Sequence, residues 1–118
     1  YLANLASCHA AVMPLTNDIF NRCKSAVRVL DAAAVGVPVI VPDVGDFSAV
    51  VRQGKTGFVL SQDQAQNGGW YTALDQLASD RPAAQAMGAN AALDLRQNWT
   101  ARNTPPIIEP EVIKWVRA

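Results

Sequence analysis

Polar and basic residues with the chemistry to hold an anion gather around position 24 of this chain. Asn21, Arg22, Lys24 and Ser25 stand between a short apolar run and a helix-forming stretch. In open parallel α/β sheets, ligands bind where the carboxyl ends of strands meet the amino ends of helices. A helix amino terminus offers free amides and the positive end of the helix dipole, and both favour phosphate. The cluster therefore predicts a site for a phosphorylated ligand.

The spacing along a predicted helix at 21–35, capped by Asn21, extends this site. Lys24 and Arg28 share a helix face and repel each other by roughly 0.2–0.5 kcal/mol, a cost that a bound anion would remove. The amides of residues 22–24 would lie in the first turn, where a helix supplies no acceptor. Amides, a hydroxyl and two or three cations suit a diphosphate. Asp31, on the same face, could accept hydrogen bonds from sugar hydroxyls.

Each of these residues also has a structural explanation that needs no ligand. Charges on one helix face are usually just solvated. The same helix has an apolar side that explains its packing, formed by Ala26, Leu30 and Ala33. Cys23 has no His or Asp evidently placed to activate it as a nucleophile.

Strand-forming and helix-forming segments alternate through the first sixty or so residues, a pattern typical of parallel sheets. Three strands are predicted, at 10–15, 37–41 and 57–60. Helices are predicted at 1–8, 21–35 and 47–53, with Gly36 and Gly54 placed to end the last two. The strand VPVIV is apolar throughout, as in a sheet that is covered on both faces.

After residue 63 the pattern is helical only, with helices predicted at 69–79, from Arg81-Pro82 to about Leu95, and at 111–117. The expected fold class is α/β: a partial Rossmann-like domain with a short parallel sheet, flanking helices and a helical C-terminal tail. A complete doubly wound domain usually has five or six strands. We therefore expect the missing strands upstream of Tyr1, in a larger protein.

The composition argues against several classes of function. The chain has 118 residues with ten basic and ten acidic side chains, so no global field attracts nucleic acid or an anionic membrane. Two isolated cysteines indicate a reducing compartment, and with the single His they offer no metal site. No apolar run is long enough to span a bilayer. We expect no metal, no cofactor, a cytoplasmic location and some self-association through the apolar C-terminal end.

The ordered motifs resemble a known family. The runs FNRCKSAVRVLDAAAVGVPVIVPDVG and VVRQGKTGFVL, followed by WYTALDQLASD and MGANAAL, are similar to the carboxyl-terminal domain of retaining, GT-B-fold glycosyltransferases of group 1. The resemblance implies that 1–104 form the second half of a nucleotide-sugar-binding domain. It implies that 105–118 cross back to an absent amino-terminal domain.

The function implied by the resemblance is transfer of a sugar from a nucleotide-diphosphate-sugar to an acceptor, without a metal at this site. The acceptor site and any catalytic base would come largely from the absent domain, so no catalytic residue is assigned. The chain alone is expected to be inactive. The base, the sugar and the acceptor are not specified by these residues.

The resemblance also implies donor-binding roles for particular positions in Phe20–Asp31 and Gly45–Phe47. Asp31 stands where the family has a glutamate that binds the ribose hydroxyls. The other residues expected at the donor are Asn21, Arg22, Lys24, Ser25, Arg28, Gly45, Asp46 and Phe47.

Three positions depart from the common family pattern. A glutamate eight positions before Asp31 is replaced by Cys23, and one four positions after Gly45 is replaced by Ala49. The usual glycine pair is Gly45-Asp46. Two alternatives therefore stay open: a GT-B-fold sugar-nucleotide epimerase, and a non-catalytic Rossmann-like interaction module. Peripheral attachment of the full-length protein to the inner face of a membrane also stays open.

Overall fold

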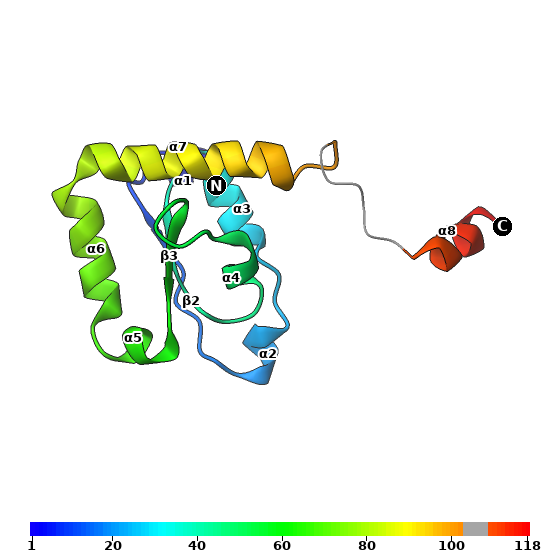
Figure 1. Cartoon of the computed structure of the whole chain (residues 1–118), viewed down its shortest axis with the longest axis horizontal. Helices are drawn as coiled ribbons and strands as arrows, with labels where there is room; N and C mark the ends of the chain where they lie inside the picture. The colour runs from blue at the N-terminus through cyan, green and yellow to red at the C-terminus, as the bar shows by residue number, and fades with distance from the viewer. Residues whose placement is uncertain (103–108) are drawn as a thin grey trace.

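The computed structural model describes residues 1–102 and 109–118. Its centre is a parallel sheet in the order β1 (Ala11–Val12), β2 (Val39–Pro42) and β3 (Gly57–Leu60) (Figure 1). β2 pairs with β3 along its whole length, from Val39 opposite Gly57 to Pro42 opposite Leu60. The predicted α/β fold with a short parallel sheet is confirmed. β1 is shorter than the predicted 10–15: its hydrogen bonds to β2 end with the Met13 amide, which donates to the Ile40 carbonyl at 3.1 Å.

Helices flank the sheet, and one of them, α7 (Arg81–Asn98), lies across its amino ends (Figure 1). In the described residues they are α1 (Leu2–Ala6), α2 (Ile19–Arg22), α3 (Val27–Ala34), α4 (Phe47–Val50), α5 (Gln62–Gln66), α6 (Gly69–Ser79), α7 (Arg81–Asn98) and α8 (Pro110–Arg117). Sequence analysis missed α5. Its signal is a capping box, in which the Ser61 hydroxyl accepts the Gln64 amide and the Gln64 side chain accepts the Ser61 amide.

The helix predicted from Asn21 to Val35 is in fact two helices, so that prediction was wrong. Asp18, not Asn21, caps α2, because its carboxylate accepts the Asn21 amide at 2.8 Å. α2 has no buried residue, whereas α3 buries Val29 and two alanines in the core. Helices in proteins are stabilised mainly by packing of an apolar face. Only the second segment has such a face, and 23–26 form a non-helical link that we call the α2–α3 link.

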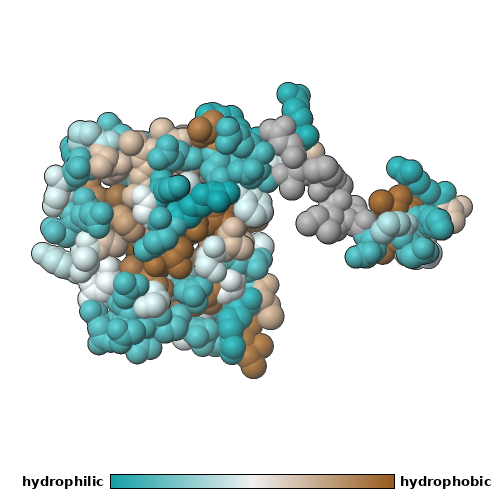
Figure 2. Space-filling view, in the orientation of Figure 1, coloured by the Kyte–Doolittle hydropathy of each residue, from teal (hydrophilic) through white to brown (hydrophobic). Residues whose placement is uncertain are grey.

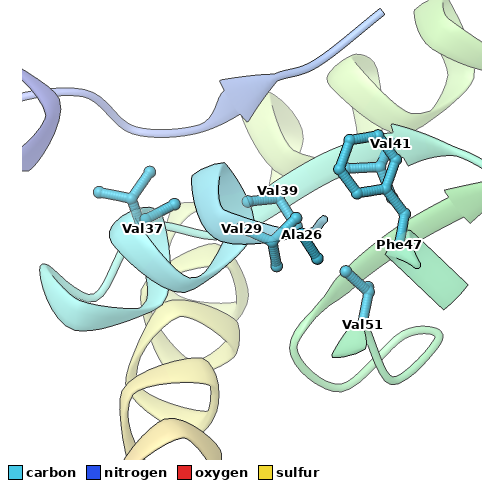
Figure 3. Packing of buried hydrophobic residues seen from close by; sticks show 8 residues of the cluster. Ala26, Val29, Val37, Val39, Val41, Phe47 and Val51 are labelled. Carbon is cyan, nitrogen blue, oxygen red and sulfur yellow. The ribbon is translucent and has the colours of Figure 1, made fainter. Parts of the chain in front are cut away.

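β2 is buried on both faces, as its continuous apolar sequence predicts. Side chains of a strand alternate between faces. Val39 and Val41 therefore pack with α3 and with Phe47 and Val51, while Ile40 points to the other face, toward α6 and α7 (Figure 3). Ile40 and Val41 are completely buried. The central strand thus fixes the positions of both helical layers.

α7 lies across the amino ends of β2 and β3. Gly88 allows this approach, because a Cβ there would overlap the Gly36 carbonyl oxygen. Gly36 itself ends α3 in the left-handed conformation, at φ +72°, as predicted. Farther along α7, the side-chain Nδ2 of Asn90 donates to the Lys55 carbonyl at 3.4 Å. These contacts hold the amino edge of the sheet and leave its carboxyl edge free for loops.

α8 is an amphipathic helix that agrees with the prediction at 111–117. None of its side chains is buried, and Trp115 is 79% exposed. Figure 2 shows apolar side chains gathered on it. The predicted break at Pro105-Pro106 lies outside the described residues. None of the helices in 1–102 and 109–118 has the length and apolar character needed to cross a membrane.

Asp94 joins α7 to the segment that follows α4. Its carboxylate accepts hydrogen bonds from Arg52 Nε at 2.9 Å, Asn98 Nδ2 at 2.8 Å and Trp99 Nε1 at 3.3 Å. Partial burial raises the pKa of Asp94, but the hydrogen bonds and the Arg52 charge outweigh this, so the pKa lies below its ordinary value. The side chain of Asp94 is only 13% exposed, against 58% for Arg52.

Replacing Asp94 with Asn should therefore destabilise the fold in a pH-dependent way. A carboxyl whose pKa is lowered by folding stabilises the protein above its unfolded pKa of about 4, and this stability is lost as the pH falls through the native pKa. We expect Asp94→Asn to cost about 1 kcal/mol or less at pH 7, and the difference from the wild type to shrink below about pH 4. Urea unfolding across this pH range measures it. Asp75→Asn on α6 controls for the change in net charge, and a pH-independent deficit in Asp94→Asn would contradict the assignment.

Candidate functional site

The candidate site lies at the carboxyl ends of the three strands, the edge where open parallel sheets bind ligands. β1 leads into the loop before α2, β2 leads into the turn at 43–46, and β3 leads into α5. α2 and α5 lie at the end of the sheet opposite α7 (Figure 1). The side-chain amide of Gln62 joins two of these segments, because its Nε2 donates to the Asp43 carbonyl at 3.3 Å.

Gly45 seats the 43–46 turn directly on the α2–α3 link. It has a φ of +59°, and a Cβ built on it would lie 3.1 Å from the Lys24 carbonyl oxygen and 3.2 Å from that of Asn21. The Arg22 carbonyl would be 3.3 Å away. These distances are tighter than ordinary van der Waals contact, so a side chain would require the carbonyls to shift by a few tenths of an ångström. The two segments that the sequence analysis assigned to one site are therefore in contact.

The free amides of the site lie one turn later than predicted. The amides of Arg22, Cys23 and Lys24 were expected to be free, but each donates to a carbonyl of residues 18–21 at 3.0–3.3 Å. In the described part of the chain, the amides of residues 25–28 donate to no acceptor. They form the amino end of α3, whose cap is Ala26, a residue without a side-chain oxygen. An anion could satisfy these donors.

Polar groups that could serve an anion surround this helix end. Lys24 and Ser25 are exposed in the link, immediately before α3. The Lys24 ammonium lies 4.7 Å from the centre of the Phe20 ring, a cation–π contact that restrains the side chain. Because Lys24 precedes α3, it does not share a helix face with Arg28, which corrects that prediction.

Arg28 and Asp31 do lie on one face of α3, as predicted. The Arg28 guanidinium is 5.2 Å from the centre of the Tyr1 ring. Its contact with Tyr1, aided by the Asp31 carboxylate, raises the pKa of Arg28 above its ordinary value. Arg28 therefore stays cationic. Asp31 is half-buried and presents a carboxylate one turn inside the helix.

Asn21 and Arg22 are used by the loop itself. The Asn21 side-chain amide donates to the Thr16 carbonyl at 3.0 Å and to the Asp18 carboxylate at 3.2 Å. Arg22 Nε donates to the Asp18 carbonyl at 3.3 Å. These contacts shape the carbonyl surface on which Gly45 sits. Asp18 is the organising residue that sequence analysis missed, although an Asp before an apolar pair is an ordinary helix-cap signal.

The turn on the other side of the site begins α4. Asp46 is the cap residue of α4, but its side chain makes no capping hydrogen bond, so its exposed carboxylate could accept from sugar hydroxyls. The Phe47 ring is buried in the core near Val41 and Val51, and it anchors the end of the turn there (Figure 3). The described residues contain no group of three His, Cys, Asp or Glu side chains that could hold a metal ion. The chemistry available here is hydrogen bonding and charge neutralisation of an anion.

Comparisons with known proteins relate this chain to one family. The family model described as "Glycosyl transferases group 1" matches residues 2–80. A D-inositol 3-phosphate glycosyltransferase of Corynebacterium aurimucosum is 38% identical over 77 residues, 64% of this chain and 18% of that protein. Its counterpart in Corynebacterium urealyticum is 34% identical over 79 residues, covering 67% and 17%. One from Stackebrandtia nassauensis is 29% identical over 98 residues, covering 83% and 20%. The chain spans a fifth or less of each relative.

Gly45→Ala should open the contact between the turn and the link. Gly54 is the matched control, because it has a similar φ of +74° but nothing within 4 Å of a built Cβ. Left-handed backbone costs an alanine about 1–2 kcal/mol at either position. We expect Gly45→Ala to lower the free energy of unfolding, measured in urea, by more than Gly54→Ala does. In nitrogen–proton NMR spectra, Gly45→Ala should also shift the amide resonances of residues 21–24. Equal losses without those shifts would show that the contact does not hold the site together.

Proposed function

Because the chain belongs to the group 1 glycosyl transferases, whose family model matches residues 2–80, we propose that it is the donor-binding part of a transferase. The enzyme would move a sugar from a nucleotide-diphosphate-sugar to an acceptor. The observation that carries the proposal is the contact of Gly45 with the carbonyls of Asn21 and Arg22 in α2 and of Lys24 in the α2–α3 link. It puts the 43–46 turn beside the uncapped amino end of α3.

The proposed diphosphate position is the amino end of α3. The free amides of residues 25–28, the Ser25 hydroxyl and the Lys24 ammonium would bind it there. As the bond to the sugar breaks, negative charge grows on the leaving diphosphate. Preorganised amides, the helix dipole and nearby cations stabilise such charge without a metal. Arg28, held by Tyr1, adds a second cation in the first turn of α3.

The sugar and ribose would be bound by carboxylates on either side of the diphosphate. Asp46, whose side chain caps no amide, is proposed for the transferred sugar. Asp31, half-buried on α3, is proposed for the ribose hydroxyls. Cys23 and Ala49 are both exposed and cannot accept hydrogen bonds as a glutamate does. The proposal therefore assigns the sugar contacts to Gly45 and Asp46 rather than to these two positions.

The rest of the active site is proposed to come from sequence outside this chain. The chain spans a fifth or less of its relatives, so an acceptor site and a catalytic base need not lie within it. The unburied apolar side chains of α8 would dock on the amino-terminal domain, and in its absence they would favour self-association. The relatives' name makes D-inositol 3-phosphate the first acceptor to test. The free thiols of Cys8 and Cys23 suit a cytoplasmic setting.

Titration with nucleotide diphosphates tests the donor site directly. Uridine, guanosine and adenosine diphosphates and pyrophosphate are added to the labelled chain while nitrogen–proton NMR spectra are recorded. We expect saturable shifts at residues 25–28 and 45–47, and about tenfold weaker binding in Lys24→Ala, as for loss of one charged contact. Lys55→Ala, at the opposite edge of the sheet, is the control. Binding that Lys24→Ala leaves unchanged would contradict the site.

Activity assays separate the transferase from its alternatives. The chain alone should not turn over a nucleotide-sugar, and turnover would overturn that expectation. The full-length protein should transfer sugar to an acceptor. Interconversion of the nucleotide-sugar without transfer would instead favour the epimerase. Failure of the full-length protein to bind diphosphates would favour an interaction module.

A further inference from the structure

A second site is indicated at the opposite edge of the sheet. A cavity of about 790 Å³ opens where the carboxyl end of α1 and the amino end of β2 meet α6 and α7. This volume lies within the range of small-molecule sites in proteins, roughly 300–1,000 Å³. The cavity is lined mainly by apolar side chains, among them Pro38, Leu74 and Leu77. It shares no residue with the donor site, so the inference does not rest on the proposed function.

One basic side chain stands in this apolar lining. Arg81, at the start of α7, directs its Nη2 to Nε2 of His9 at 2.6 Å. A guanidinium only donates, so Nε2 of His9 is the acceptor in this hydrogen bond. His9 thereby holds the guanidinium without neutralising it. In the described residues, Arg81 forms no ion pair with a carboxylate. The neighbouring Asp80 is used at the helix cap, where it accepts the Ala83 amide at 3.1 Å.

We propose that this cavity binds a small carboxylate with an apolar body. The carboxylate would pair with Arg81, whose planar guanidinium matches two carboxylate oxygens, and His9 would keep the guanidinium in place. The apolar body would cover Leu74 and Leu77. A single cation balances one negative charge, and this favours a monocarboxylate over a phosphate dianion. Leu74 is 42% exposed, so the ligand would bury apolar surface that now faces water.

The two cysteines give a direct test, because they report on the two edges of the sheet. Cys8 is exposed and lines the cavity, whereas Cys23 is exposed in the α2–α3 link. Cys23→Ser leaves Cys8 as the single thiol, and Cys8→Ser leaves Cys23. Octanoate should slow alkylation of Cys8 in a saturable way and leave the rate at Cys23 unchanged. Protection of both thiols, or of neither, in the folded protein would overturn the proposal.

Charge and apolar contributions are then separated in the protein whose single thiol is Cys8. Arg81→Gln should weaken octanoate binding about tenfold, as for loss of a charged hydrogen-bonded pair. Arg96→Gln, on the same helix, should not. 1-Octanol should protect Cys8 less than octanoate does, and inorganic phosphate should not protect it. Octanol as effective as octanoate, or phosphate equally protective, would overturn the assignment of a carboxylate. Leu74→Gln weakens binding without removing charge, so the test stands even if Arg81→Gln fails to fold.

Discussion

Burial of β2 on both faces is the constraint on which the rest of this structure depends. Val39 and Val41 require the α3 and α4 layer on one side, and Ile40 requires the α6 and α7 layer on the other. Alternation along an extended strand leaves neither layer free to slide by one residue, because a slip would exchange the two faces. The four residues of β2 therefore set the positions of both helical layers. The loops at the carboxyl edge inherit their positions from that strand.

At the carboxyl edge, the fold uses backbone rather than side chains to join two loops. Gly45, with no Cβ and a left-handed backbone, sits closely on the carbonyls of Asn21, Arg22 and Lys24. Asp18 prepares this surface by capping the amino end of α2 and by accepting hydrogen bonds from Asn21 and Arg22. The exposed side chains of Lys24 and Ser25 take no part in this backbone contact. Their polar groups therefore remain available to contact a ligand.

The sequence predicted the sheet well, because continuous β-branched runs and glycine-ended helices depend on neighbours in the chain. It predicted the α2–α3 break poorly. Residues 21–35 are all compatible with a helix, but the chain around the break packs against Gly45, which is distant in sequence and gives no local signal. α5 was missed for a different reason: a helix of five residues has too little periodicity, although its capping box is visible.

The candidate site shows the same contrast between features set by neighbours in the chain and features set by residues distant in sequence. The sequence grouped the residues near position 24 with Gly45, and the structure brings these segments together, while their role in binding a donor stays a prediction. The free amides were assigned to residues 22–24 because the helix was started at Asn21 instead of Val27. The cavity beside Arg81 could not be anticipated, since His9 and Arg81 are 72 positions apart and nothing local links them.

β1 has a consequence for handling the chain. Among the described residues this strand pairs only with β2, so its other edge presents unpaired amide and carbonyl groups. Such an edge is a template for any extended segment, including one from another copy. With two residues and Pro14 close behind, it offers little to define a register. Aggregation at high concentration would then reflect an open hydrogen-bonding edge, and it would not by itself be evidence for a native dimer.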